Sequence, residues 1–223
     1  MMKKTVLSSL LVLLLLILVF TGCGTKSDPA AAPTPTGGFN PEDVSYSENQ
    51  GMELNPGTGR DMYITDPVPE GMPLPVEPQD AEIDDVEYHC ILSISCASIL
   101  DNMDQCKKNK RELVPEDGWI FPPTEVVFFS GESVFQVLKR VCKQQKIHME
   151  FADNPVYNSA YIEGINNLYE RDVGDLSGWM YSVNGWYPNY GCSRYALKDG
   201  DVVEWRYTCD LGRDIGGEYV VGG

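Results

Sequence analysis

The chain has 223 residues, with 33 Asp or Glu against 17 Lys or Arg, and its formal net charge at pH 7 is -16. This acidic excess excludes nucleic acid as an expected partner, because binding a phosphate backbone requires a basic surface. The length suits one folded domain with additional segments.

The first 22 residues have the pattern of an export signal. Lys3 and Lys4 precede a largely apolar stretch from Leu7 to Phe20, which is shorter than the roughly 20 apolar residues of a membrane span. A basic start, an apolar centre and small residues at the exit predict a signal peptide over residues 1–22.

The residues around Cys23 refine this prediction. Phe20-Thr21-Gly22-Cys23 resembles the lipobox of bacterial lipoproteins, although the first position usually holds Leu. The resemblance implies that Cys23 carries lipid and anchors the protein to the outer face of a Gram-positive-type cell membrane. Plain secretion and an uncleaved signal anchor are the alternatives.

Residues 23–82 are predicted to be the lipid-attachment cysteine and a flexible linker. They are rich in Pro, Gly, Ser and Thr, with prolines at positions 67, 69, 73, 75 and 78. Apolar residues show no period there, so we expect a disordered tether that forms no core. The folded domain is then expected at residues 83–216, followed by a flexible tail at residues 217–223.

Six cysteines remain if Cys23 carries lipid. An even number outside the cell favours disulfides, with 15 possible pairings. The sequence has no CxxC motif and its two histidines lack ligand spacing, so no metal site is predicted. The disulfide candidates are Cys90, Cys96, Cys106, Cys142, Cys192 and Cys209.

Alternating and helical patterns follow one another along the folded part. Residues 87–99 predict a central strand, and residues 125–129 predict a second, short strand. Ser133 and Gln136 match a capping box, and apolar residues at 134, 138, 141 and 142 predict one amphipathic helix of about 14 residues. Strands are then expected at residues 148–151 and 161–165.

The C-terminal part adds a hairpin and a last strand. Asn184-Gly185 between aromatic flanks is a strong hairpin signal. Residues 202–208 alternate as a half-buried strand does. Strands, one helix and further strands predict an α+β fold of β-grasp type, with a single mixed sheet packed on one main helix.

Several motifs in combination resemble the DUF4430 family, the transcobalamin-like C-terminal domain of bacterial surface proteins. They are Gly131-Glu132-Ser133-Val134-Phe135, Tyr161-Ile162-Glu163-Gly164-Ile165, Gly178-Trp179-Met180-Tyr181-Ser182-Val183-Asn184-Gly185, Leu197-Lys198-Asp199-Gly200-Asp201 and Trp205-Arg206-Tyr207-Thr208. The resemblance covers roughly residues 87–215 and implies a β-grasp fold that binds a soluble ligand.

The resemblance also implies a ligand class. In transcobalamin-like proteins a similar domain closes over cobalamin that a helical barrel holds, so cobalamin or another corrinoid is the expected ligand. No barrel precedes Glu82 here, and a lone domain would cover one face of so large a molecule.

An aromatic loop is the expected ligand site. Aromatic residues at a hairpin end suit stacking or partner recognition, and the resemblance places residues 184–190 toward the ligand. The candidate ligand-binding residues are Tyr181, Asn184, Trp186, Tyr187 and Tyr190. Packing in the core is the alternative role for each of these rings.

No catalytic motif occurs in the sequence, and we predict that the chain is not an enzyme. The expected function is a cell-envelope lipoprotein that recognises a small molecule or delivers it to a transporter. The alternative is a surface adhesion or assembly module that binds protein or glycan. The expected partners are therefore the membrane, a small ligand or an envelope protein.

Overall fold

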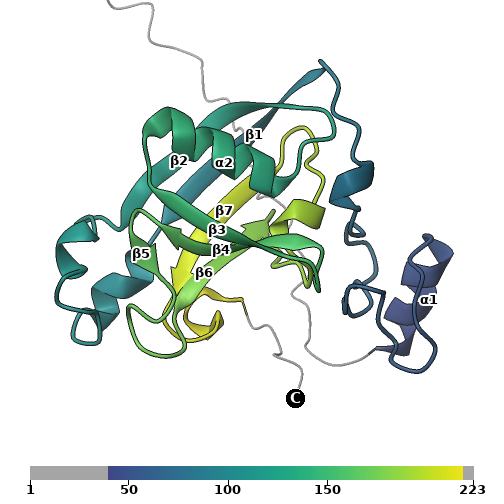
Figure 1. The fold of residues 1–223 in the computed structure, drawn as a ribbon, viewed down its shortest axis with the longest axis horizontal. Helices are drawn as coiled ribbons and strands as arrows, with labels where there is room; N and C mark the ends of the chain where they lie inside the picture. The colour runs from purple at the N-terminus through teal and green to yellow at the C-terminus, as the bar shows by residue number, and fades with distance from the viewer. Residues whose placement is uncertain (1–39, 218–223) are drawn as a thin grey trace, which may run out of the picture. The chain divides into compact units, whose positions relative to one another are not determined.

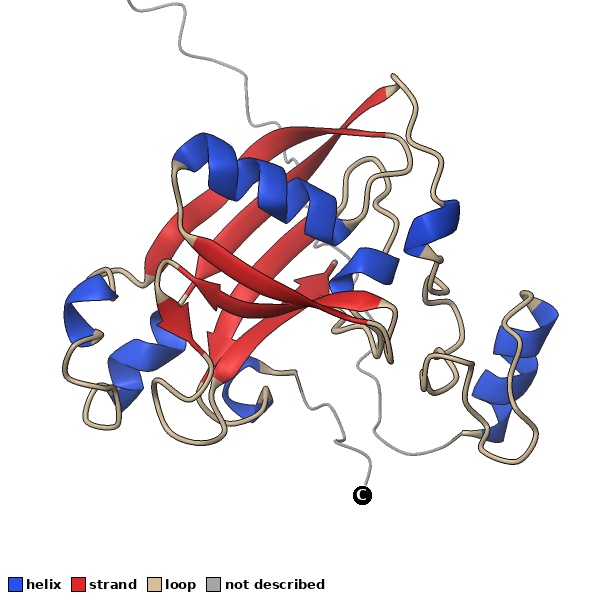
Figure 2. Cartoon of the chain, in the orientation of Figure 1, coloured by secondary structure: helices blue, strands red, loops and turns tan. Residues whose placement is uncertain are grey.

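The computed structural model describes residues 40–217. The predicted signal peptide, the lipid-attachment cysteine Cys23 and tail residues 218–223 lie outside the described residues. Figure 1 shows the order of the elements, and Figure 2 shows strands at the centre of the described part with helices around them.

The main sheet has four strands in the order β2-β1-β7-β6. Strand β1 (Glu87–Ser95) pairs antiparallel with β2 (Trp119–Phe129) and parallel with β7 (Val202–Thr208). Strand β6 (Gly178–Val183) pairs antiparallel with β7. The mixed sheet and the central place of β1 agree with the prediction, whereas β2 begins six residues earlier than expected.

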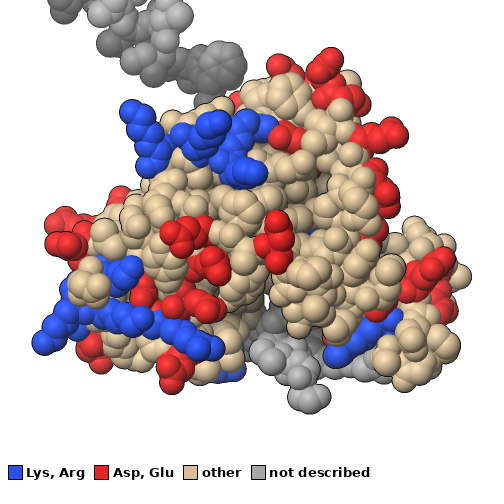
Figure 3. Space-filling model, viewed as in Figure 1, with Lys and Arg blue, Asp and Glu red and all other residues tan. Residues whose placement is uncertain are grey.

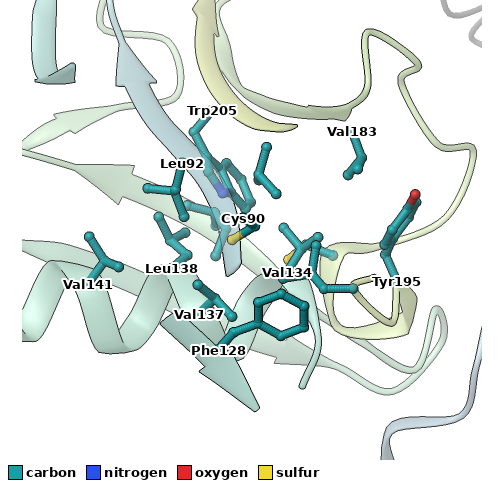
Figure 4. Packing of buried hydrophobic residues seen from close by; sticks show 14 of the residues in the cluster. Cys90, Leu92, Phe128, Val134, Val137, Leu138, Val141, Val183, Tyr195 and Trp205 are labelled. Carbon is teal, nitrogen blue, oxygen red and sulfur yellow. The ribbon is translucent and has the colours of Figure 1, made fainter. Parts of the chain in front are cut away.

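Helix α2 (Val134–Gln145) packs on this sheet as predicted. Both hydrogen bonds of the capping box are present, since the Ser133 side chain accepts from the Gln136 amide and the Gln136 side chain accepts from the Ser133 amide. The apolar face of the helix points at strands β1 and β7 and closes the main core (Figure 4). Its buried residues are Val134, Val137, Leu138, Val141 and Cys142.

A second sheet was not predicted. Strands β3 (Met149–Asn154), β4 (Ser159–Ile165) and β5 (Leu168–Tyr169) form a separate antiparallel sheet in the order β3-β4-β5. The α+β class is confirmed, but the strands divide between two sheets. Strand periodicity shows that a segment is extended and does not show which strand it pairs with.

Short helices complete the described part. The α-helix α1 spans Pro41–Asn49. The 3-10 helices are η1 (Pro78–Asp80), η2 (Ala97–Asn102), η3 (Arg111–Leu113), η4 (Cys192–Arg194) and η5 (Arg213–Ile215). Among residues 40–217, no helix has the length and apolarity that crossing a bilayer requires.

The prediction of a flexible linker up to residue 82 is wrong from residue 40 onward. The Ser47 hydroxyl accepts a hydrogen bond from the Val68 amide at 3.0 Å, and both residues are fully buried. Met52 and Val68 belong to the main core. The sequence pattern missed this packing because the segment is held by contacts to distant residues and not by a repeat of its own.

The structure does not show the predicted disulfides, since none of the six described cysteines is joined to another. Five are buried, and Cys209 is half-buried. Burial raises the pKa of Cys90, Cys96, Cys142 and Cys192 to about 12. The buried thiols therefore act as small apolar side chains that fill the two cores.

Candidate functional site

The predicted ligand-binding loop leaves the sheet through a tight turn. Asn184 and Gly185 have φ angles of 53° and 80°, as a two-residue hairpin turn requires. The Asn184 side chain donates to Asp201 at 2.8 Å and accepts from the Val202 amide at 2.9 Å. Asn184 thus fastens the turn to the start of β7, and its amide group is already committed to this role.

After this turn the chain departs from the predicted hairpin. Trp186 bridges back to Val183, but the long partner of β6 is β7. Residues 184–195 therefore form a connection between two sheet strands, which we call the loop face. It includes four of the five predicted ligand-binding residues together with Tyr195 and Arg194.

The aromatic rings of the loop face pack on one another. Trp186 lies 5.9 Å from Tyr190 between ring centroids, and Tyr190 stacks on Tyr195 at 6.1 Å. The Tyr181 hydroxyl donates to the Tyr190 carbonyl at 2.8 Å, which joins β6 to the loop. Trp186, Tyr190 and Tyr195 are buried, and Tyr181 is half-buried. Four predicted or neighbouring rings thus form one cluster.

Tyr187 points away from this cluster toward the C-terminal segment. Its hydroxyl donates to the Ile215 carbonyl at 3.0 Å and accepts from Arg206 at 3.3 Å. Burial is the largest influence on Tyr187 and raises its pKa, although Arg206 acts in the opposite direction. Tyr187 therefore stays a neutral phenol that fastens the segment at Ile215.

A close approach of two chain segments positions Arg194. A Cβ atom on Gly191 would lie 2.2 Å from the Ser159 hydroxyl, so only glycine fits there. The Ser159 hydroxyl accepts from the Ser193 amide at 3.1 Å, and the Ser193 hydroxyl accepts from the Ala160 amide at 3.0 Å. These bonds hold helix η4, which ends at Arg194, against strand β4.

Arg194 is the charged centre of the site, and only 1% of it is exposed. Its guanidinium donates to Asp61 and to Glu77, both at 2.7 Å, and to the Thr65 hydroxyl at 2.6 Å. The guanidinium carbon also lies 5.0 Å from the centroid of the Tyr63 ring. Ion pairs with two carboxylates compensate the burial of this charge.

The partners of Arg194 belong to the segment that the sequence assigned to the linker. We call residues 61–77 the strap. Asn189 donates to the Asp66 and Pro67 carbonyls at 3.0 and 3.1 Å. The Tyr190 hydroxyl donates to the Pro73 carbonyl at 2.7 Å. The strap thus covers the loop face around Asn189 and Tyr190, whereas Tyr187 is covered by the C-terminal segment at Ile215.

Sequence reasoning found the aromatic rings but missed Arg194 and the strap. The ion-pair partners Asp61 and Glu77 lie more than 110 residues before Arg194. No motif links a loop arginine to acids at such a distance. The local signal of the strap is a run of prolines, and such a composition is also typical of a linker.

Unpaired buried polar atoms gather at the loop face. In the described residues five buried side-chain nitrogen or oxygen atoms make no hydrogen bond. Three of them are Trp186 Nε1, Asn189 Oδ1 and Arg194 Nε; the others are His148 Nδ1 and Trp205 Nε1. Leaving such an atom unpaired costs about 1–3 kcal/mol. The loop face therefore has hydrogen-bonding capacity that the strap does not use.

Other surface features lie away from the loop face. Basic side chains gather over α2, where Lys139, Arg140, Lys143 and Lys146 are found, and a second basic group lies at the lower left of the view, with acids scattered over the rest (Figure 3). A hollow of about 440 Å³ lies between β2 and α2 and is lined by Phe121, Val127, Arg140 and Gln144 among others. Within residues 40–217, no three His, Cys, Asp or Glu residues are placed to hold a metal ion.

Comparison with known proteins identifies the domain. Residues 131–209 match the family described as Domain of unknown function (DUF4430), which confirms the predicted domain over that span. No curated protein matches the chain.

Two solved structures show weak likenesses. Haptocorrin in complex with Cbi is 16% identical, with a TM-score of 0.42 over 57% of this chain and 26% of its own. A candidate metal-binding protein from Ruminococcus gnavus ATCC 29149 is 15% identical, with a TM-score of 0.31 over 54% of this chain and 96% of its own. The chain thus spans about a quarter of the haptocorrin chain, and neither likeness carries an argument about function.

Proposed function

We propose that this chain, which carries a DUF4430 domain at residues 131–209, is a non-catalytic binding protein of the cell envelope whose ligand site is the loop face. The observation that carries the proposal is the set of buried polar atoms there without hydrogen-bond partners. A ligand that reaches Trp186 Nε1, Asn189 Oδ1 and Arg194 Nε would satisfy groups that the folded chain leaves unpaired.

The aromatic cluster suits a flat, partly apolar ligand. Trp186 and Tyr190 offer ring faces beside polar atoms, which is the composition of many small-molecule sites. A corrinoid is the first class to test, since it combines a flat macrocycle with amide side chains. Such a ligand must displace part of the strap, because the strap covers these rings in the structure.

Ligand titration tests the small-molecule proposal. The purified mature chain is mixed with cobinamide, cobalamin or haem, and the visible spectrum and the melting temperature are followed. A ligand that binds only the folded chain must raise the melting temperature. If no compound changes either signal at millimolar concentration, the small-molecule proposal fails.

A matched pair of tryptophan variants locates the site. Trp186→Phe keeps an aromatic ring but removes the unpaired indole nitrogen of the loop face. Trp205→Phe removes an equally unpaired nitrogen from β7 within the sheet. We expect W186F to weaken ligand binding at least tenfold and W205F to leave it unchanged. Equal losses in both variants would place the ligand elsewhere.

The envelope location is a separate part of the proposal and rests on the sequence of residues 1–23. Growth with radiolabelled palmitate should label the wild-type protein and leave Cys23→Ala unlabelled. Recovery of unlabelled wild-type protein in the cytosolic fraction would refute the lipoprotein assignment.

The alternative function, an adhesion or assembly module that binds protein or glycan, is favoured by one observation. A peptide segment, the strap, already lies on the loop face and is held there by side chains of the domain. Binding of a peptide is therefore a chemistry that this surface performs within its own chain.

A further inference from the structure

The strap is bound to the loop face mainly through its backbone and two acidic side chains. Asn189 and Tyr190 donate to three strap carbonyls, and the Arg194 carbonyl accepts from the Val76 amide at 2.9 Å. The acids Asp61 and Glu77 lie at the two ends of the strap and meet at Arg194. Since both ends of the strap reach the same guanidinium nitrogen, the strap is a loop that is fastened at its two ends.

The composition of the strap matches the surface beneath it. Prolines at positions 67, 69, 73 and 75 restrict the backbone, which lowers the entropy lost when the segment is fixed, and turns at Asp61–Ile64 and Pro69–Met72 bend the segment back on itself. Aromatic rings are the usual partners of such segments. The loop face supplies these rings together with one buried cation for the two acids of the strap.

The connection that follows the strap can permit its release. Residues 81–87 are all exposed, and they form no helix or strand before β1 begins at Glu87. Residues 72–78 of the strap region are only half-buried. Release of the strap would uncover Tyr190 without breaking a pair of the main sheet, and it would also take Val68 out of the main core.

From these contacts we infer that the loop face is a peptide-binding groove and that residues 61–77 are its built-in, exchangeable occupant. The ligand class is a proline-rich segment that folds back as a loop, so that an acid near each end reaches Arg194. The inference rests on the loop face being the binding surface, as proposed above, but not on a corrinoid being the ligand. The strap then regulates access, because an external ligand competes with a tethered one.

The test cleaves the connection between the strap and the domain and keeps both parts of the chain in the sample. A specific protease site is inserted between Asp80 and Ala81, where both residues are exposed. After cleavage, the fragment that contains the strap should stay with the domain in size-exclusion chromatography. A fluorescent synthetic peptide of residues 58–80 is then added, and its anisotropy is measured before and after cleavage.

We expect the peptide to bind the cleaved chain and to displace the fragment. The uncleaved chain should bind the peptide at least tenfold more weakly, since a short tether gives the strap an effective concentration on the order of 1 mM. A peptide with Asp61→Asn and Glu77→Gln should bind at least tenfold more weakly than the natural peptide. This control changes only the peptide and cannot unfold the domain.

A variant of the domain gives a second control. Arg194→Met should weaken peptide binding, whereas Arg213→Met, which removes an exposed ion pair with Asp210, should not. If the fragment cannot be displaced by excess peptide, or leaves at once and the peptide does not bind, the exchangeable groove is refuted.

Titrating a corrinoid into the same two chains separates this inference from the proposed ligand. Peptide exchange without corrinoid binding would support the groove and remove the corrinoid. Corrinoid binding that is equal before and after cleavage, with no peptide exchange, would refute the strap as a competitor and retain the small-molecule proposal.

Discussion

Replacing Arg194 by methionine tests how the strap is held. Methionine keeps much of the apolar stem but removes the charge that pairs with Asp61 and Glu77. The side chains of Arg194 and Asp61 are 2% and 8% exposed, whereas that of Glu77 is 30% exposed. The main loss of stability therefore comes from Asp61, whose carboxylate would remain nearly buried without a cation to pair with.

Removing one partner of a buried ion pair costs about 3–5 kcal/mol. Asp61 belongs to a peripheral strap, so it can return to water if the strap detaches. Detachment limits this cost, and we expect the attached state of the strap to be destabilised by about 3 kcal/mol. This value corresponds to an increase of roughly 100-fold in the detached population, since about 1.4 kcal/mol is a factor of ten.

Limited proteolysis measures this population. Chymotrypsin cleaves after aromatic residues, and Tyr63 in the strap lies against Arg194 in the folded chain. When closing is faster than cleavage, the rate of cleavage follows the open population. We expect cleavage at Tyr63 about 100-fold faster in R194M, with the urea transition of the main core retained.

The matched control is Arg60→Met. Arg60 pairs with Asp66 on the surface, with both side chains about half exposed. Exposed pairs contribute little, so this variant should cleave at the wild-type rate. A change of less than threefold in R194M, or an equal change in R60M, would show that the buried ion pairs do not hold the strap.

Three further predictions concern the domain beneath the strap. Burial raises the pKa of four core thiols, Cys90, Cys96, Cys142 and Cys192, from 9.0 to about 12, so stability is full below pH 9 and is lost as the pH rises toward 12. At pH 10 the loss is about 1 kcal/mol for each thiol, which urea unfolding at pH 8 and pH 10 measures; pH-independent stability would contradict free thiols. Ser133→Ala removes the cap of α2 and should cost about 1 kcal/mol in the same assay, while an unchanged midpoint would show that the cap is dispensable. Gly191→Ala places a Cβ 2.2 Å from the Ser159 hydroxyl and should lower the melting temperature by several degrees, whereas Gly178→Ala, whose nearest contact is 3.7 Å, should lower it much less.

Sequence patterns were sufficient where neighbouring residues determine the structure. The capping box of Ser133 and Gln136 predicted the start of α2, because both hydrogen bonds join residues three apart. The Asn184-Gly185 pair predicted a tight turn, because both residues accept positive φ angles. The DUF4430 motifs identified the domain for the same reason, since they record such local features in order.

Only the tertiary structure decided how distant segments meet. The strap has no apolar period, and it is ordered by Arg194 and Asn189, which come more than 100 residues later. The cysteine count favoured disulfides, but the structure places three thiols in or against each of the two cores without joining any of them. Pairing between remote residues depends on the folded geometry, and a loop arginine does not reveal in sequence which acids will approach it. The sequence therefore determined the domain and its helix, while the fold determined that the proposed site is covered by the chain's own strap.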